Sequence, residues 1–403
     1  MTNRKSKVLL LENIHPGAAA RFREAGYDVE SLPHSLEESA LLRKLSGISI
    51  VGIRSKTKIN ERVLAEAGDL VAIGAFCIGT DQMDLQACAK KGVAVFNAPY
   101  SSTRSVVEVI LGEILLLARG VFAKSQKLHR GVWDKSATGS NEIRGKKLGI
   151  IGYGKIGSQL SVLAESLGME VYFYDLDVKL VLGNAKGCRS LAQLLKIADI
   201  VTLHVDGRAE NRNMIGRREF RQMKPGVIFL NASRGFVVDN EALAENLKSG
   251  HVRAAAIDVF PREPKGNQEK FVSPLQGMDQ VILTPHVAGS TEEAQRDIGS
   301  FVSERIIDYA SDGSTLHSVN FPNVQLPEIK NAHRLIHIHE NIPGMLAQIN
   351  RVFAMHSANI LGQYLKTTET IGYAITDIGT AYRQKIVEDL KQIPHTIKFR
   401  VLY

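Results

Sequence analysis

Residues 148–157 read Leu-Gly-Ile-Ile-Gly-Tyr-Gly-Lys-Ile-Gly, an apolar run that leads into three glycines with the spacing GxGxxG. The apolar run predicts a buried strand, and the residues from Lys155 onward have helical periodicity. A strand, a glycine turn and a helix in this order bind the diphosphate of a dinucleotide at the helix N-terminus. Gly152 permits the tight turn, Gly154 lets the diphosphate approach the backbone, and Gly157 lets the helix pack against the strand. This stretch therefore predicts a dinucleotide-binding α/β fold.

The next apolar run, residues 170–175, ends in Asp175. An acidic residue about 20 positions after the glycine turn accepts hydrogen bonds from both hydroxyls of the adenosine ribose, and it repels a 2′-phosphate. The predicted cofactor is therefore NAD and not NADP.

Further apolar runs alternate with helix-like segments on both sides of this unit. Such alternation predicts parallel sheets covered by helices on both faces. Together with residues 148–154 and 170–175, the runs at 199–205, 227–233, 254–260 and 281–286 predict a six-stranded doubly wound sheet. A second Rossmann-like sheet is predicted from the runs at 7–13, 48–54, 70–76 and 92–99.

Two long helical patterns cover residues 103–120 and 290–313. After the second of them, a segment with two prolines at 318–332 has the composition of a linker, and the C-terminal part of the chain beyond it has a different order of elements. The remaining residues read strand, helix, strand, strand, helix, strand, which is typical of a ferredoxin-like βαββαβ unit. We therefore expect a discontinuous substrate-binding domain (1–101 and 289–330), a nucleotide-binding domain (102–288) and a C-terminal regulatory domain (331–403).

The length, charge and apolar stretches of the chain indicate which classes of binding partner are expected. The chain has 403 residues, which exceed the roughly 250–300 that one hydrophobic core supports, and its net charge is +8. No polybasic tail or basic helix interleaved with aromatic residues predicts a nucleic-acid or membrane partner. The most apolar stretch, residues 106–118, is shorter than the roughly 20 residues that span a bilayer.

The cysteines and histidines indicate in which cellular compartment the protein is expected and whether a metal site is expected. Three cysteines without CxxC spacing indicate neither a disulfide framework nor a zinc site, and we expect a cytoplasmic protein. His337 and His339 alternate on one predicted strand and so share a face. No further ligand stands at metal-binding spacing from them, so no metal site is predicted.

Four polar residues follow strands of the nucleotide-binding sheet. They are Arg234, Asp258, Glu263 and His286. Ligands of doubly wound sheets bind outside the carboxyl ends of the strands, so these side chains are expected to gather at the cofactor. Reduction of a ketone by hydride needs a cation for the substrate carboxylate and an acid for the developing alkoxide, and Arg234 and His286 are of the right types. Glu263 suits a partner that orients the histidine and favours its protonated form.

The motifs GYGKIG, NASRG, AAAIDVF with Pro-Arg-Glu-Pro, and LTPHVAGST resemble those of the D-isomer-specific 2-hydroxyacid dehydrogenases, over almost the whole chain. The resemblance implies that Arg234, Glu263 and His286 are catalytic. It also implies that NAD is held by a larger set: Gly152, Gly154, Lys155, Ile156, Gly157, Asp175, Ala232, Ser233, Arg234, Asp258, His286, Val287, Ala288 and Gly289.

The same resemblance implies a substrate. Arg54 and Ser55 match a substrate-binding loop of the family, and a guanidinium beside a hydroxyl is suited to phosphate. Ser102, where close relatives often have asparagine, matches the substrate crevice, and Lys135 is expected to add positive charge. Family members with a C-terminal tail of this kind oxidise a phosphorylated 2-hydroxy acid, D-3-phosphoglycerate, as the first step of serine synthesis.

The C-terminal unit resembles an ACT domain. The turn that begins at His339 and Asn341 matches the place where family effectors bind, and Asn359 matches a contact from a second chain. In the family such domains pair through their sheets and respond to L-serine. The resemblance therefore implies regulation by L-serine and assembly as a homotetramer. The linker around residues 330–332 lacks the paired glycines that some relatives carry, so we expect it to be stiffer and the coupling to be altered.

Two other functions fit the same residues. One is a dehydrogenase for another 2-hydroxy acid, such as glycerate, lactate or 2-hydroxyglutarate, which would share Arg234, Glu263 and His286. The other is a non-catalytic NAD-sensing protein like the corepressors that descend from this family.

Overall fold

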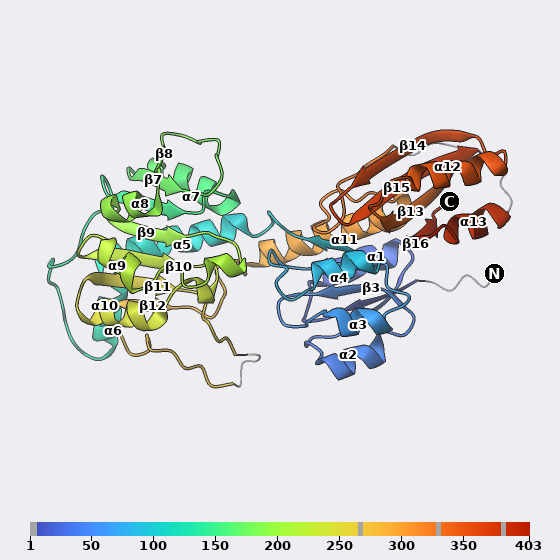
Figure 1. Ribbon diagram of the computed structural model, residues 1–403. Coiled ribbons are helices and arrows are strands. Elements are labelled where there is room, and N and C mark those ends of the chain that lie inside the picture. The colour runs from blue at the N-terminus through green and yellow to red at the C-terminus, as the bar shows by residue number, and fades with distance from the viewer. Residues whose placement is uncertain (1–5, 265–268, 328–331, 380–383) are drawn as a thin grey trace. The chain divides into compact units, whose positions relative to one another are not determined.

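A computed structural model describes residues 6–264, 269–327, 332–379 and 384–403 (Figure 1). The chain divides into two compact units, Ser102–Ala294 on the one hand and Met1–Ser101 with Gln295–Tyr403 on the other. The α/β fold class with two parallel sheets and a C-terminal βαββαβ unit is confirmed. The boundaries between three domains stay a prediction.

The unit Ser102–Ala294 is built on a parallel sheet, to which the described residues contribute seven strands in the order β12-β11-β10-β9-β6-β7-β8. Their bounds are β6 (Lys147–Ile151), β7 (Glu170–Tyr174), β8 (Lys186–Gly187), β9 (Ile200–Leu203), β10 (Val227–Asn231), β11 (Val252–Ile257) and β12 (Val281–Leu283). The strand order reverses direction between β6 and β9, which is where doubly wound sheets bind their ligands. Six of these strands are those predicted, and the two-residue edge strand β8 is additional.

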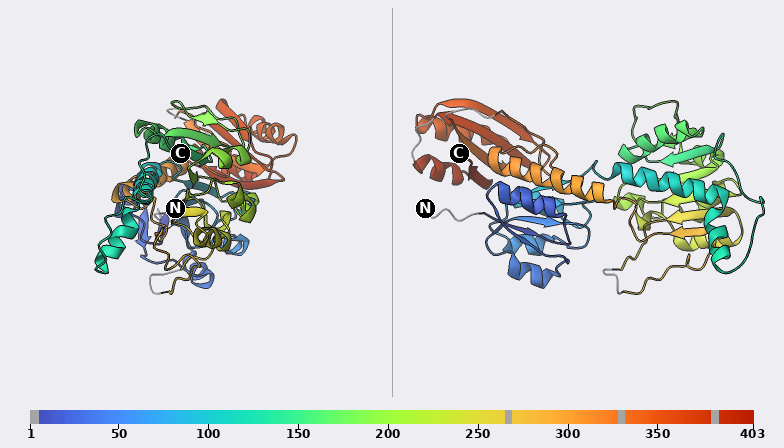
Figure 2. Two further views of the ribbon diagram at one scale, coloured as in Figure 1. Left: turned by 90° about the vertical axis from the view of Figure 1, so that its left-hand side faces the viewer. Right: turned by 180° about the vertical axis from the view of Figure 1, so that it is seen from behind.

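Helices cover both faces of this sheet. On one face lie α5 (Thr103–Arg119) and α7 (Lys155–Ser166), whose apolar side chains share a core with β6 and β7. The other face carries α8 (Leu191–Ile197), α9 (Arg217–Gln222) and α10 (Asn240–Lys248). Short 3₁₀ turns stand at Ala209–Asn211 and Gly235–Val237. The right-hand view of Figure 2 shows the α5 side of the sheet.

The sequence did not predict α6 (Val121–His129), which follows α5 after the left-handed residue Gly120. None of its residues is buried, and Phe122 is only partly buried against the core of the unit.

The second parallel sheet has the order β2-β1-β3-β4-β5 among the described residues. Its strands are β1 (Lys7–Leu10), β2 (Asp28–Ser31), β3 (Ile48–Ile53), β4 (Ala72–Ala75) and β5 (Ala94–Asn97). One face packs against α1 (Pro16–Glu24) and α11 (Glu292–Asp312), and the other against α2 (Glu38–Lys44), α3 (Glu61–Glu66) and α4 (Leu85–Lys90). β2 was not predicted, because its sequence DVES is almost entirely polar.

The C-terminal unit has the predicted order of elements. They are β13 (Ala332–Glu340), α12 (Met345–Met355), β14 (Ile360–Thr367), β15 (Ile371–Gly379), α13 (Gln384–Lys391) and β16 (Thr396–Val401). The strands form an antiparallel sheet in the order β14-β15-β13-β16. One face packs on α12 and α13, and the other shares the apolar core of α11.

Polar contacts also join this sheet to the end of α11. Arg334 on β13 is fully buried and forms two 2.8 Å hydrogen bonds with the carboxylate of Asp377 on β15. Its remaining nitrogen donates to the carbonyl of Asp312, the last residue of α11. Arg400 on β16 donates to the carbonyl of Ala310, and its guanidinium lies 4.7 Å from the ring centroid of Tyr309.

Residues 328–331, the part of the linker where paired glycines are missing, lie outside the described residues, so the expected stiffness of the linker stays a prediction. Within the described ranges, no helix has both the length and the apolar character needed to cross a membrane.

Candidate active site

The glycine turn between β6 and α7 has the geometry that a dinucleotide requires. Gly152 has φ = 91°, and a Cβ there would lie 2.5 Å from the carbonyl oxygen of His204. A Cβ on Gly157 would lie 2.2 Å from the carbonyl oxygen of Gly152. By contrast, a Cβ on Gly154 would meet no described atom within 4 Å, so the backbone is open at the N-terminus of α7. The three glycines therefore fit a bound diphosphate.

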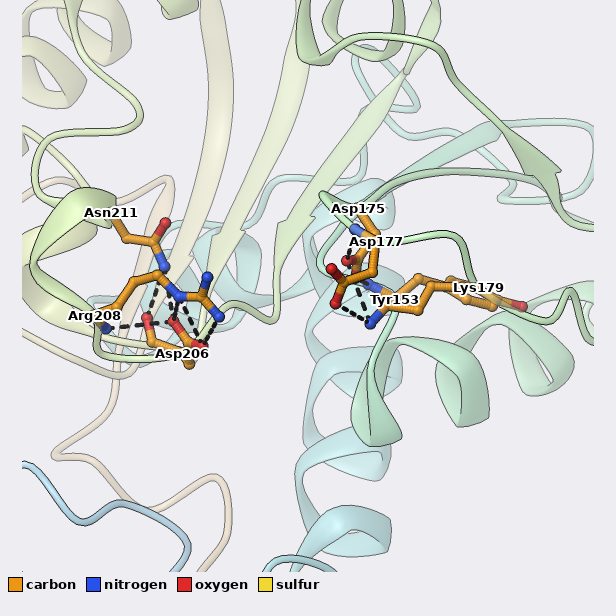
Figure 3. A network of polar contacts seen from close by, with 7 residues as sticks. All are labelled: Tyr153, Asp175, Asp177, Lys179, Asp206, Arg208 and Asn211. Carbon is orange, nitrogen blue, oxygen red and sulfur yellow. Dashed lines mark hydrogen bonds and ion pairs between the residues drawn. The ribbon is translucent and has the colours of Figure 1, made fainter. Parts of the chain in front are cut away.

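Asp175 lies directly after β7 and faces the glycine turn (Figure 3). Its carboxylate accepts hydrogen bonds from the backbone amides of Tyr153 at 2.7 Å and Asp177 at 3.0 Å. Lys179 extends from the same loop, 3.5 Å from Asp175 and 3.0 Å from Asp177. The hydrogen bond to Asp177 raises the pKa of Lys179. The carboxylate of Asp175 is thus fixed at the strand end where a ribose would be bound.

A second polar group, also drawn in Figure 3, follows β9. Arg208 forms a two-pronged ion pair with Asp206, and Asn211 donates to the same carboxylate at 3.0 Å. The hydrogen bond from Arg208 lowers the pKa of Asp206. Asp206 stands at the strand-end edge where ligands of doubly wound sheets bind, whereas the polar residues predicted from the sequence follow β10, β11 and β12.

The loop after β10 is held by its own side chains. The Asn231 side chain accepts hydrogen bonds from the amide and the hydroxyl of Ser233, at 3.0 and 2.8 Å, and it donates to the Arg234 carbonyl at 3.1 Å. Asn231 and Ser233 are buried, whereas Ala232 and Arg234 are half-buried. Asn231, which the sequence analysis did not select, therefore fixes the backbone that carries Arg234.

Asp258 follows β11 and holds the loop that carries His286. Its buried carboxylate accepts hydrogen bonds from the Thr284 hydroxyl at 2.7 Å and from the backbone amides of Val287 and Ala288 at 2.8 and 3.0 Å. The His286 amide donates to the Asp258 carbonyl at 2.8 Å. His286 is forced into a left-handed backbone conformation, with φ = 55°, which is uncommon outside glycine and is found at functional sites.

Glu263 and His286 form the pair that the sequence predicted. Glu263 Oε2 lies 2.9 Å from His286 Nδ1, and Glu263 Oε1 accepts a hydrogen bond from the Phe260 amide. This carboxylate raises the pKa of His286, and the effect exceeds the opposing effects of burial and of the nearby Arg234 charge. Burial pushes the pKa of Glu263 up, but His286 and Arg234 outweigh it and hold that pKa low. The arrangement is that of a general acid–base histidine with an orienting carboxylate.

The remaining cofactor-loop residues predicted from the sequence lie at the same strand ends. Lys155 and Ile156 open α7, while Gly289 lies on the His286 loop beside the buried Ser102, the residue before α5. A Cβ on Gly289 would lie 3.3 Å from the Ser102 hydroxyl. Lys135 is exposed in the segment after α6.

Arg54 and Ser55 belong to the other unit, where they follow β3. Gln82 Nε2 donates to the Arg54 carbonyl, and the Cys77 thiol also approaches it, at 3.5 Å. The backbone amides of Lys56 and Thr57 donate to the side chain of Glu12 at 3.0 and 2.7 Å. The sequence analysis missed Glu12, because nothing near it in sequence indicates a partner 44 residues away.

The structure does not bring the three proposed effector residues together within one chain. His339 is buried, and its Nδ1 lies 3.3 Å from that of His337. Burial lowers the pKa of both histidines, that of His337 to about 4. Asn341 is exposed just beyond the C-terminal end of β13, close to His339. Asn359 lies near the opposite end of that strand, because its carbonyl accepts a hydrogen bond from the amide of Gly379, and Gly379 pairs with Ala332, the first residue of β13.

Comparisons with known proteins extend from these motifs to the whole chain. Residues 111–288 match the model of the D-isomer specific 2-hydroxyacid dehydrogenase NAD binding domain, and residues 335–398 match that of an AHAS small subunit-like ACT domain. D-3-phosphoglycerate dehydrogenase of Haemophilus influenzae is 50% identical over 99% of this chain and 98% of its own length. The enzyme of the same name from Escherichia coli K12 is 51% identical over the same shares of the two chains.

Among solved structures, D-lactate dehydrogenase from Aquifex aeolicus, complexed with NAD and lactic acid, superposes with a TM-score of 0.69 at 25% identity. It matches 78% of this chain and 100% of its own. The structural likeness thus accounts for most of the chain, and the ACT domain match accounts for residues near its end. From these matches, together with the glycine turn and the Glu263–His286 pair, the chain belongs to the D-isomer specific 2-hydroxyacid dehydrogenase family and, within it, to the D-3-phosphoglycerate dehydrogenases.

Proposed function

We propose that this chain oxidises D-3-phosphoglycerate to 3-phosphohydroxypyruvate with NAD, the first step of serine synthesis by the phosphorylated route. The observation that carries the proposal is the 50–51% identity to enzymes of that name along nearly their full length. The 2.9 Å contact between Glu263 and His286 supports it, since the reaction needs a group that takes up a proton.

His286 is the proposed general base. Its Nδ1 faces Glu263, which leaves Nε2 to accept the proton of the substrate's C2 hydroxyl as the carbonyl forms. In the reverse direction the protonated imidazole returns that proton, and Glu263 stabilises its positive charge. NAD, when bound, supplies the acceptor for the hydride from C2. Arg234 is proposed to hold the substrate carboxylate through its guanidinium.

The cofactor is proposed to be held mainly by fixed backbone. The glycine turn with Lys155 and Ile156 would receive the diphosphate, and Asp175 would accept hydrogen bonds from the ribose hydroxyls. The nicotinamide end would face a larger group of strand-end residues, comprising Ala232, Ser233, Arg234, Asp258, His286, Val287, Ala288 and Gly289.

The substrate phosphate is proposed to bind Arg54 and Ser55, with Ser102 and Lys135 as further contacts. Arg54 is half-buried and follows directly after β3. A guanidinium suits a phosphate because its planar donors match two phosphate oxygens.

Formation of NADH from D-3-phosphoglycerate tests the proposal, with D-glycerate, D-lactate and D-2-hydroxyglutarate as competing substrates. His286→Ala is expected to lower kcat about 10²- to 10⁴-fold while the protein still binds NADH. Turnover confined to an unphosphorylated acid would favour one of the other dehydrogenases. NADH binding without turnover of any 2-hydroxy acid would favour the NAD-sensing alternative.

Regulation, assembly and location are part of the same proposal. L-serine is proposed to bind between two copies of the ACT domain, with His339 and Asn341 from one copy and Asn359 from the other. This pairing would account for the separation of these residues within one chain. The active form would be a cytoplasmic homotetramer of three-domain chains (1–101 with 289–330, 102–288 and 331–403). Light scattering gives the mass, and initial rates at increasing L-serine measure inhibition.

A further inference from the structure

We propose that Glu12 is a positioning residue for the loop 54–57, and that it thereby sets the affinity of the chain for its phosphorylated substrate. The inference rests on the proposed function, in which Arg54 and Ser55 bind the phosphate. Glu12 itself would not touch substrate, and it acts only through the backbone of this loop.

The Glu12 side chain binds the backbone at the C-terminal end of the loop. It lies just beyond the end of β1, its backbone is left-handed at φ = 64°, and its side chain is 7% exposed. The two side-chain oxygens accept separate hydrogen bonds, Oε2 from the Lys56 amide at 3.0 Å and Oε1 from the Thr57 amide at 2.7 Å. Neighbouring amides that point to one carboxylate fix the course of the chain between them.

The other side of the loop is held as well. The Arg54 carbonyl accepts a hydrogen bond from Gln82 Nε2 and is approached by the Cys77 thiol. Thr57 is buried at 1% exposure, whereas Ser55 is exposed. The loop is therefore anchored at Arg54 on one side and at Lys56 and Thr57 on the other, with the exposed Ser55 between them. The Arg54 guanidinium and the Ser55 hydroxyl are the groups proposed to bind phosphate.

A neutral, apolar residue at position 12 would avoid the cost of burying a carboxylate. Each oxygen of this buried carboxylate accepts a hydrogen bond from an amide of the loop, so its effect acts on loop order. A loop that is already ordered does not lose backbone freedom when substrate binds, and this raises affinity. Freeing the backbone of one residue corresponds to a factor of about 5–30 in a binding constant.

Glu12→Gln tests the inference, because glutamine keeps the size of the side chain but can accept only through one oxygen. The KM for D-3-phosphoglycerate is expected to rise about 5- to 30-fold. We expect kcat and the KM for NAD to change less than about twofold, because the groups at the strand ends of the other unit are intact. Glu12→Asp, which keeps the charge with a shorter reach, is expected to give an intermediate KM.

Val63→Ala is the matched control. Val63 is fully buried on α3 in the same unit, so the variant loses stability without touching the loop. Its KM for D-3-phosphoglycerate is expected to stay at the wild-type value. Equal rises of KM in Val63→Ala and Glu12→Gln would mean that Glu12 acts through general stability, and would overturn the inference.

Arg54→Ala separates this inference from the proposed function. If Arg54→Ala raises the KM and Glu12→Gln does not, the positioning role is overturned while the proposed function stands. If the wild-type chain fails to oxidise D-3-phosphoglycerate, the proposed function itself is wrong. Should Glu12→Gln fail to fold, Glu12→Asp decides in its place, and an unchanged KM in that variant counts against the role of Glu12.

Discussion

Glu263 Oε2 lies 2.9 Å from Nδ1 of His286, and this contact favours the protonated form of the imidazole. The hydrogen bond and the charge of Glu263 raise the pKa of His286. Oxidation needs the neutral imidazole, so kcat/KM for oxidation is expected to rise with pH through this raised pKa. Reduction needs the imidazolium and is expected to fall over the same range.

Glu263→Gln is expected to move both pH profiles to lower pH. The amide removes the negative charge that raises the pKa of His286, so the imidazole is neutral at a lower pH. Reduction at neutral pH therefore loses more activity than oxidation does. Initial rates in both directions across the pH range measure the shift, and profiles that stay in place would contradict the role given to Glu263.

Asp175→Ala is expected to relax the choice of cofactor. The variant loses an ionised acceptor fixed by the Tyr153 amide, and hydrogen bonds to a charged group contribute about 1.5–3 kcal/mol. The ratio of kcat/KM with NAD to that with NADP should fall about 10- to 100-fold. Asp177→Ala, which removes an exposed carboxylate from the same loop, is the control and should change the ratio far less. A similar fall in both variants would show that loop charge alone selects the cofactor.

Glu113 on α5 predicts a pH dependence of stability. Burial, assisted by the nearby Asp258 charge, raises the pKa of Glu113 from 4.5 to about 8, and its Oε1 lacks a partner among the described residues. The folded state therefore keeps a proton that the unfolded chain releases, so stability is lost as pH rises from about 4.5 to about 8. Glu113→Gln should flatten this decline and add about 1–3 kcal/mol at neutral pH. Urea unfolding at several pH values measures it, and parallel declines in both proteins would contradict the assignment.

Arg334→Met should destabilise the unit that contains the ACT domain. The variant leaves Asp377 buried without its ion-pair partner, which costs about 3–5 kcal/mol. The double variant Arg334→Met with Asp377→Leu should recover most of that loss, because an apolar pair needs no charge balance. Arg62→Met is the control, since Arg62 is 77% exposed and its ion pair with Glu38 contributes at most about 1 kcal/mol. Denaturant unfolding compares the four proteins, and no recovery in the double variant would contradict the reasoning.

Elements with a strong apolar pattern were predictable from the sequence, and elements without one were not. The runs that form β6, β9 and β10 are buried on both faces of their sheet, and their composition alone indicates that environment. β2 is a polar edge strand, and α6 buries none of its residues. Only their tertiary contacts and backbone hydrogen bonds determine such elements, and periodicity does not report these.

The residues of the candidate site also fall into those that the sequence predicts and those that it does not. Glu263 and His286 stand at strand ends within short motifs, so their types and positions predicted a pair. The supporting groups were less visible. Asn231 holds the backbone at Arg234, and Glu12 holds a loop far along the chain. A contact between residues that are far apart in the sequence leaves no local sequence pattern. Residues in a short motif at the end of a predicted strand can be assigned a role, because the strand places them at the ligand-binding edge of the sheet.

The C-terminal unit is not a module that can be removed without exposing apolar surface in the rest of the chain. Ile336, Ile338, Tyr373 and Ile375 of its sheet belong to the same apolar cluster as Val302, Ile306 and Tyr309 of α11. A chain cut before residue 332 would lose the proposed effector residues and would also expose to water the apolar surface of α11 that shares this cluster. A variant that does not respond to the proposed effector is therefore better sought by substitutions in the turn after β13 than by truncation. By the same reasoning, grafting this tail onto a shorter relative would require redesign of the recipient's equivalent helix.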